Sequence, residues 1–393
     1  MSRSTKAYRW AIATLFMVGV ALPLLDWCFD LDKNPGLSEN RVLAAAPAWP
    51  KGLAEWQALP KALEAYWSDA FGFRRRLIRW HSIVNYEFGV SPTPAVVIGK
   101  RSQLFFAGDR CFEQHRGLAP FSSAELDDWA NQLEARRAWL ARRGSHFLFL
   151  ITPDKQSIYP DDIPERYGPL TTSPVDQLLE RLRGSRVDVL DLRARERAAR
   201  ADGPVFLLTD SHWNDHGAYV GYAAVVERLR AWYPSMRARE ASTFERHISR
   251  PWNGDLSLML PGVYQILKKP SEQWSPSPPP ATRLLPSDGY APAGSNGYTV
   301  YAGPQQSAPR ALFFIDSFLL ERGGGPAPER AVPPPPPTFR PQLLYGELFS
   351  RAAFSWQYPF DAAIVEHEHP DVVIEEHTER FIRQGPAGTV PPD

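Results

Sequence analysis

An aspartate and a histidine two residues apart, Asp210 and His212, are the side chains best suited to chemistry in this 393-residue chain. They lie between the apolar run 204–208, which predicts a buried strand, and the run 218–232, whose apolar residues recur at helical spacing. If the chain is extended between these runs, Asp210 and His212 face one cleft and Ser211 turns away from it. A carboxylate that holds an imidazole in one tautomer supplies two members of a nucleophilic triad.

The pair also has a purely structural explanation, because Asp, Ser and Asn are all good helix caps. However, Asn214 or Asp215 can cap the following helix alone, which leaves the pair without a structural role. The missing member of a triad is a nucleophile. Ser317 follows the apolar run 311–315, a predicted buried strand, and α/β hydrolytic folds present a nucleophile at the carboxyl end of such a strand. A helix cap is the alternative for Ser317 too.

Strands and helices alternate along the body of the chain. The pattern predicts strands over 146–152, 187–192, 204–208, 311–315 and 371–375, and helices over 123–143, 176–183, 196–200 and 218–232. Residues 95–98 and 104–106 flank Gly99-Lys100-Arg101-Ser102 and predict a hairpin. This alternation predicts an α/β domain of three layers with a mainly parallel sheet.

The N-terminus has the charge pattern of a membrane anchor. Residues 10–25 are uncharged and apolar, residues 27–29 extend the run to about 20 residues, and Arg3, Lys6 and Arg9 precede it. We therefore expect an uncleaved anchor over residues 10–29, with the tip in the cytoplasm and the body outside. A cleaved signal peptide and a buried core helix are the alternatives.

The chain is predicted to have four parts: tip and anchor (1–32), a tether rich in Pro, Ala and Trp (33–60), the α/β domain (61–385) and a disordered tail (386–393). The 44 basic and 44 acidic residues balance, so nucleic acid is not an expected partner. The three arginines 74–76 either form a solvated helix face, the commoner case, or meet anionic lipid.

No metal or cofactor is expected. His367, His369 and His377 lie beside the predicted strand 371–375, but their spacing matches no zinc signature, so we interpret them as surface histidines. Cys28 and Cys111 lack such spacing as well, and their positions do not favour a disulfide.

Taken in order along the chain, several short segments resemble the AlgJ/AlgX family of alginate O-acetyltransferases. The segments are Glu39-Asn40-Arg41, Phe71-Gly72-x-Arg74, Val97-Ile98-Gly99-Lys100 with Leu104-Phe105, Pro153-Asp154-Lys155-x-Ser157-Ile158-Tyr159-Pro160, Asp210-Ser211-His212-Trp213, Ile315-Asp316-Ser317-Phe318, and 370–374 with Glu379-Arg380. The resemblance covers about residues 37–385 and is closer to the anchored AlgJ type. As in that family, the Asp-x-His-Trp motif precedes the serine, the reverse of ordinary SGNH hydrolases.

The resemblance implies an SGNH-hydrolase-like domain that transfers acetyl groups onto exopolysaccharide hydroxyls in the periplasm. It makes Ser317 the nucleophile, His212 the general base and Asp210 the orienting carboxylate. It also implies an exopolysaccharide acceptor and a membrane-bound O-acyltransferase partner that delivers acetyl across the inner membrane. Three aromatic residues are candidates for stacking on sugar rings, or equally for core packing: Trp213, Tyr159 and Trp252.

One residue departs from the family pattern. Ile315 stands where the serine motif usually begins with glycine, a residue that permits close backbone approach at the nucleophile turn. Two other functions remain open on the sequence: a carbohydrate acetylesterase that uses the same three residues, and a non-catalytic scaffold of a polysaccharide acetylation complex.

Overall fold

The computed structural model describes residues 3–29, 31, 43–168, 170–286, 290, 292, 294–320 and 339–391. The predicted motif at 39–41 and the Gly/Pro-rich segment 321–338 lie outside the described residues. The chain divides into two compact units. The smaller comprises residues 1–94 with 257–267, and the larger comprises residues 95–256 with 268–393.

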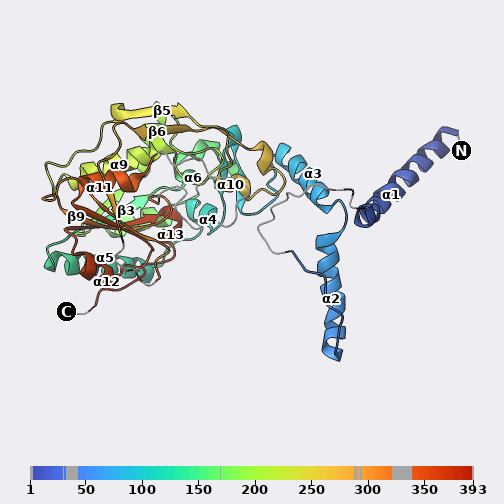
Figure 1. The fold of residues 1–393 in the computed structure, drawn as a ribbon, viewed down its shortest axis with the longest axis horizontal. Helices are drawn as coiled ribbons and strands as arrows, with labels where there is room; N and C mark the ends of the chain where they lie inside the picture. The colour runs from blue at the N-terminus through green and yellow to red at the C-terminus, as the bar shows by residue number, and fades with distance from the viewer. Residues whose placement is uncertain are drawn as a thin grey trace. The chain divides into compact units, whose positions relative to one another are not determined.

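A mainly parallel sheet organises the larger unit (Figure 1). Its strands are β3 (His146–Thr152), β4 (Asp188–Asp191), β7 (Arg283–Leu285), β8 (Tyr298–Ala302), β9 (Arg310–Ile315), β10 (Arg351–Trp356) and β11 (Val372–Thr378), in the order β4-β3-β11-β9-β10-β8-β7. The strands from β4 to β10 are parallel, whereas β8 runs antiparallel to β10 and β7 antiparallel to β8. The predicted α/β class is confirmed.

Helices cover both faces of this sheet, with α9 and α11 on one side and α5 and α12 on the other (Figure 1). The helices of this unit are α4 (Cys111–His115), α5 (Ser123–Arg142), α6 (Lys155–Ile158), α7 (Pro174–Arg181), α8 (Arg193–Ala199), α9 (Asp215–Leu229), α11 (Pro341–Leu348), α12 (Ala362–Glu368) and α13 (Glu379–Ile382). Because side chains alternate along a strand, Phe313 and Ile315 of β9 enter one core while Leu312 and Phe314 enter the other. Covered faces on both sides explain why these strands are continuous apolar runs.

Smaller elements complete this unit. The predicted hairpin is confirmed as β1 (Val96–Ile98) and β2 (Leu104–Phe106), and a second antiparallel pair joins β5 (Phe244–Ile248) to β6 (Glu272–Pro276). The 3-10 helices are Lys100–Ser102, Pro160–Asp162, Glu165–Tyr167, Arg200–Asp202 and Ala241–Thr243, with Tyr264–Ile266 in the smaller unit, and α10 (Asp255–Leu258) lies where the two units divide.

The strand predicted over 204–208 is wrong. Only an isolated bridge joins Phe206 to Trp213, and the chain turns back over residues 208–212. The backbone oxygens of Leu207 and Leu208 accept hydrogen bonds from the buried Lys155 Nζ, and the Leu208 oxygen also accepts one from Leu104 N–H, so no regular strand ladder forms. The apolar run 204–208 therefore correctly indicated a buried segment, but it did not indicate a strand.

The interpretation of His377 as a surface residue is wrong as well. His377 is buried on β11, packs edge-on against Trp129, and places Nε2 3.1 Å from Glu375 Oε1. Glu375 also pairs with the buried Arg136. Within the segment predicted as a tail, Ala387 and Gly388 each accept a hydrogen bond of 2.7 Å from Arg136.

Among the described residues up to 94, the smaller unit contains three α-helices: α1 (Arg3–Phe29), α2 (Leu53–Ala70) and α3 (Arg74–Glu87). α2 begins inside the segment predicted as a tether, and residues 71–73 separate it from α3. Within α1, residues 8–26 form a 19-residue segment of mean hydropathy 1.6, none of it buried. This segment is long and apolar enough to cross a membrane, as a signal anchor would be.

Candidate active site

The structure brings Ser317 together with Asp210 and His212, although His212 precedes it by 105 residues in sequence. His212 Nε2 lies 2.9 Å from Ser317 Oγ, and His212 Nδ1 lies 2.8 Å from Asp210 Oδ1. Asp210 and His212 stand on the turn before α9, whose N-cap Asn214 accepts a hydrogen bond from Gly217 N–H. Ser317 follows β9 at the carboxyl edge of the sheet. Because a carboxylate only accepts, Nδ1 carries the proton toward Asp210, and Nε2 is left to accept the Ser317 hydroxyl proton.

Hydrogen bonds from His212 and Asp255 hold the Asp210 carboxylate. Its Oδ1 accepts from both the backbone N–H (3.0 Å) and the ring Nδ1 of His212, and its Oδ2 accepts from Asp255 N–H at 3.0 Å. Gly254 makes this approach possible, since a Cβ there would lie 2.3 Å from the Thr209 oxygen and 2.7 Å from Asp210 Cβ. The local fold thus holds the carboxylate in one orientation.

Asp255 is a member of this site that sequence reasoning missed. Its Oδ2 lies 3.5 Å from His212 Nδ1 and accepts from Ser211 Oγ at 2.5 Å, while its Oδ1 accepts from Ser211 N–H at 2.7 Å. Burial and, secondly, the neighbouring Asp210 raise the pKa of Asp255. Ser211 therefore does not turn away from the cleft, as an extended chain would require, because the segment is a turn. A Gly-Asp pair in a loop gave no sequence signal for this role.

The serine turn is held by the side chain of the preceding residue. Asp316 Oδ1 accepts from Phe318 N–H at 2.7 Å, and its Oδ2 accepts from Thr378 N–H at 3.0 Å and from the Tyr358 hydroxyl at 2.8 Å. Asp316 N–H in turn donates to Glu376 Oε2 at 2.7 Å. These bonds fix the backbone that presents Ser317.

Ile315 fits this arrangement without strain. It is the last residue of β9, it is buried in the core, and its backbone is extended, a conformation that any residue adopts. Ile315 does not have the positive φ that would require glycine.

Lys155 hydrogen-bonds to the backbone of the turn that carries Asp210. It is buried, and its Nζ donates to the oxygens of Leu104 (2.9 Å), Leu207 (2.5 Å), Leu208 (3.0 Å) and Asp210 (3.3 Å). One ammonium thereby joins β2 to the turn that carries Asp210.

The three aromatic candidates occupy different places. Trp213 is buried, its Nε1–H donates to the Phe318 oxygen at 3.0 Å, and it lines a small pocket together with Ser317 and His212. Tyr159 is a core residue whose hydroxyl accepts from Val205 N–H at 2.9 Å, and it does not line that pocket. Trp252 is half-buried, with Nε1–H donating to Ser271 Oγ at 3.2 Å. Of the three, Trp213 alone lines the pocket beside Ser317.

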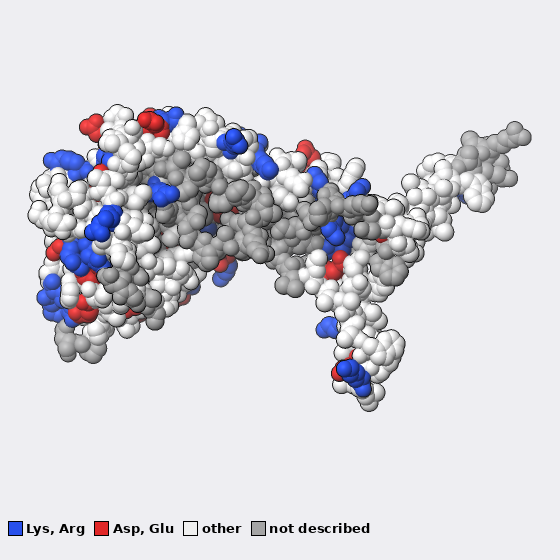
Figure 2. Space-filling model, viewed as in Figure 1, with Lys and Arg blue, Asp and Glu red and all other residues white. Residues whose placement is uncertain are grey.

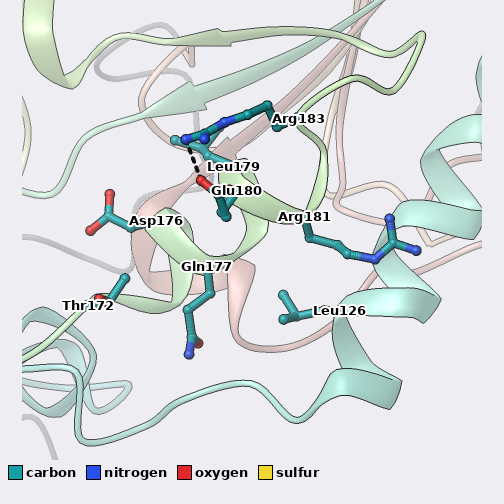
Figure 3. Close-up of a pocket in the computed structure, with 8 residues that line it drawn as sticks. All are labelled: Leu126, Thr172, Asp176, Gln177, Leu179, Glu180, Arg181 and Arg183. Atoms are coloured by element: carbon teal, nitrogen blue, oxygen red, sulfur yellow. Dashed lines mark ion pairs between the residues drawn. The ribbon is translucent and has the colours of Figure 1, made fainter.

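A larger pocket, of about 750 Å³, lies along α7 and contains none of these residues (Figure 3). Its charged side chains already have partners: Arg181 pairs with Asp127 at 2.9 Å, and Glu180 pairs with Arg183. Local ion pairs therefore explain its polar lining, and none of the candidate site residues lines it.

Asp210, His212 and Asp255 also offer ligand atoms within 4.8 Å of one another, a set that could hold a metal ion. However, the ring nitrogen that would bind the ion is the one hydrogen-bonded to Asp210. The hydrogen-bonded chain to Ser317 accounts for this geometry without a metal.

Comparison with known proteins places the chain among acetyltransferases. Residues 96–280 match the family model described as an SGNH hydrolase-like domain, acetyltransferase AlgX. A probable alginate O-acetylase AlgJ of Pseudomonas aeruginosa is 30% identical over 285 residues, which are 71% of this chain and 67% of the relative. The AlgJ of Pseudomonas syringae is 26% identical over 216 residues, about half the length of each chain.

Among solved structures, the O-acetyltransferase domain of Pseudomonas putida AlgJ is similar with a TM-score of 0.47 and 20% identity, over 74% of this chain and 93% of that one. Bacillus cereus PatB1 has a TM-score of 0.48 at 12% identity, over 66% and 91%. On the sequence matches, this chain belongs to the AlgJ/AlgX family of SGNH-hydrolase-like acetyltransferases.

Proposed function

We propose that this protein acetylates hydroxyl groups of an exopolysaccharide, alginate or a similar polymer, in the periplasm through an acetyl-serine intermediate. The observation that carries the proposal is the continuous hydrogen-bonded chain from Asp210 through His212 to Ser317. Ser317 is the nucleophile, His212 the general base and Asp210 the carboxylate that orients the imidazole.

In the first half-reaction, Ser317 Oγ attacks the acetyl carbonyl and its proton passes to His212 Nε2. The leaving group of the donor takes that proton, and acetyl-Ser317 remains. A sugar hydroxyl then attacks the acetyl group, gives its proton to Nε2, and Ser317 Oγ leaves and is reprotonated. The Ser317 backbone N–H has no acceptor among the described residues, which makes it a candidate donor to the oxyanion.

Asp255 is the positioning residue of this proposal. Its backbone N–H donates to Asp210, and its carboxylate accepts from Ser211, the residue between Asp210 and His212 in the chain. As the imidazole becomes cationic during proton transfer, a second carboxylate 3.5 Å from Nδ1 stabilises the charge.

The apolar segment 8–26 supports anchoring of the protein in the inner membrane through residues 10–29, with the larger unit in the periplasm. On this proposal the acceptor is the exopolysaccharide, and a membrane-bound O-acyltransferase is the partner that supplies acetyl. Trp213 is the aromatic residue placed to contact a sugar or donor at the pocket; Tyr159, which packs in the core, is no longer proposed for this role.

The test is acetyl release from a chromogenic acetyl ester by the full-length protein in detergent, beside Ser317→Ala, His212→Ala and Asp210→Ala. We expect all three variants to lose activity while remaining folded by circular dichroism, and intact mass to show an acetyl adduct on the wild type but not on Ser317→Ala. Transfer is then distinguished from hydrolysis by adding candidate glycans. A folded wild type with neither ester cleavage nor adduct would refute the catalytic proposal.

A further inference from the structure

α3 carries an exposed apolar stripe. Leu77, Trp80, Val84 and Phe88 follow at intervals of three or four residues along α3 and its C-cap, so that at about 100° per residue they share one side of the helix. All four are at least half exposed, and Trp80 and Phe88 are the most exposed at 71% and 82%. The described residues of the chain leave this surface open.

The opposite side of α3 is covered by the chain's own fold. Ser82 is buried there, and a Cβ on Gly262 would lie 2.6 Å from the Arg79 Cα, so the segment 257–267 packs against this side. The stripe is therefore not the face by which α3 joins its own unit.

The start of α3 is bound to the end of the apolar segment of α1. Phe73 N–H donates to Asp26 Oδ2 at 2.9 Å, and a Cβ on Gly72 would lie 2.2 Å from the Pro23 oxygen. Phe73 takes a left-handed φ of 59° in this tight reversal. Asp26 is the last residue of the segment suited to cross the membrane. If α1 crosses it as proposed above, α3 begins at the periplasmic surface of the bilayer.

The charge of α3 suits that surface. Its 14 residues contain four arginines and one glutamate, and Lys and Arg side chains gather over α3 in Figure 2. Basic residues are attracted to anionic lipid head groups, and tryptophan is enriched at the membrane interface. α2 also has exposed apolar residues, among them Trp56 and Trp67, but its sequence contains three acids and one lysine. Charge therefore favours α3.

We propose that α3 lies in the interface of the periplasmic leaflet, with the stripe from Leu77 to Phe88 inserted below the head groups and the exposed Arg75 and Arg76 near lipid phosphates. The protein is then held by two elements, a spanning helix and an interfacial helix joined at Asp26. This inference rests on the proposed anchoring through α1, and it does not depend on the catalytic residues.

The test uses the full chain in proteoliposomes that contain phosphatidylglycerol, with Cys28→Ser as the background. A nitroxide label is placed at Val84→Cys in the stripe or, as the matched control, at the next residue, Asn85→Cys, about 100° around the helix. The collision rate of the nitroxide with oxygen, which concentrates in lipid, is compared with its collision rate with a water-soluble nickel complex. We expect the label at 84 to favour oxygen and the label at 85 to favour nickel.

Three outcomes would overturn the inference. Equal access of nickel to both labels means that α3 stays in water. A label at 84 that is immobile and shielded from both reagents means that a protein surface covers the stripe. Failure of the protein to float with the vesicles removes the anchoring itself. Ester cleavage measured on the same vesicles reports the catalytic proposal separately, since neither labelled position belongs to the site.

Discussion

Lys155 offers the sharpest test of how the fold holds the turn that carries Asp210 and His212. Its Nζ is buried and lies within hydrogen-bonding distance of four backbone oxygens, including those of Leu207 and Asp210. In Lys155→Met the side chain keeps its bulk and loses its donors. The Leu208 oxygen keeps a second bond from Leu104 N–H, so the loss falls mainly on the oxygens of Leu104 and Leu207.

The magnitude follows from these contacts. A buried polar group left without a partner costs about 1–3 kcal/mol, and relief from burying an ammonium offsets part of the sum. We expect a net loss on the order of 3 kcal/mol, a large share of the usual 5–15 kcal/mol of a folded domain. Because the Asp210 oxygen is among the acceptors, kcat should fall about tenfold or more, since each ~1.4 kcal/mol is a factor of ten.

The assay is thermal unfolding by circular dichroism together with acetyl ester cleavage, both on the full-length protein in detergent. Lys100→Met, at an exposed lysine of the neighbouring hairpin, is the matched control and should leave both properties unchanged. Activity is compared at a temperature where every variant is folded. A Lys155→Met protein with wild-type melting temperature and turnover within twofold would refute the reasoning.

The same lysine makes a pH prediction. Burial lowers the pKa of Lys155 to about 7, although Asp210 raises it in opposition. Its ordinary value in an unfolded chain is about 10.4, so between these values the unfolded state binds more protons and stability rises with pH. The stability gained from neutral Lys155 is complete above the pKa of the unfolded chain, about 10.4, and is lost as the pH falls to the pKa of the folded protein, about 7. Unfolding of Lys155→Met followed from pH 7 to 10 should lack this rise.

Three further variants test the remaining buried groups. Burial and, secondly, Asp316 raise the pKa of Glu376 well above its usual range, so Glu376→Gln should keep the wild-type melting temperature near neutral pH. Glu376→Ala leaves Asp316 N–H without this acceptor and should lower the melting temperature by several degrees. Because the pKa of Glu376 is raised in the folded state, the stability that this group contributes is present below about pH 4.3 and declines as the pH rises through its pKa in the folded protein. The melting temperature of Glu376→Gln, measured as a function of pH, should lack this decline. Asp255→Asn should lower kcat about tenfold with little change in KM in steady-state ester cleavage, because it removes a charge beside His212 without changing a residue that lines the pocket. A rise of about tenfold in KM with an unchanged kcat would contradict the positioning role.

The sequence predicted most of the framework because its signals are local. Apolar runs such as 146–152 and 311–315 are continuous because the strands are covered on both faces, and they coincide with β3 and, within one residue, with β9. The helix over 123–143 is marked by a capping box between Ser122 and Glu125, which the structure contains. The prediction failed at 204–208, where an apolar segment is buried but bonds to a lysine side chain far away in sequence.

The sequence by itself determined the α/β class, the apolar N-terminal helix, and which Asp, His and Ser to bring together. Tertiary structure alone decided the rest, because it depends on contacts between segments distant in the chain. Asp255 reaches Asp210 across 45 residues of sequence, and Lys155 reaches the same turn across 55. His377 is buried because β11 packs against α5. The stripe on α3 is exposed because the segment 257–267 covers the opposite side of that helix. No local pattern encodes these contacts, since a side chain's role there is set by what the fold places opposite it.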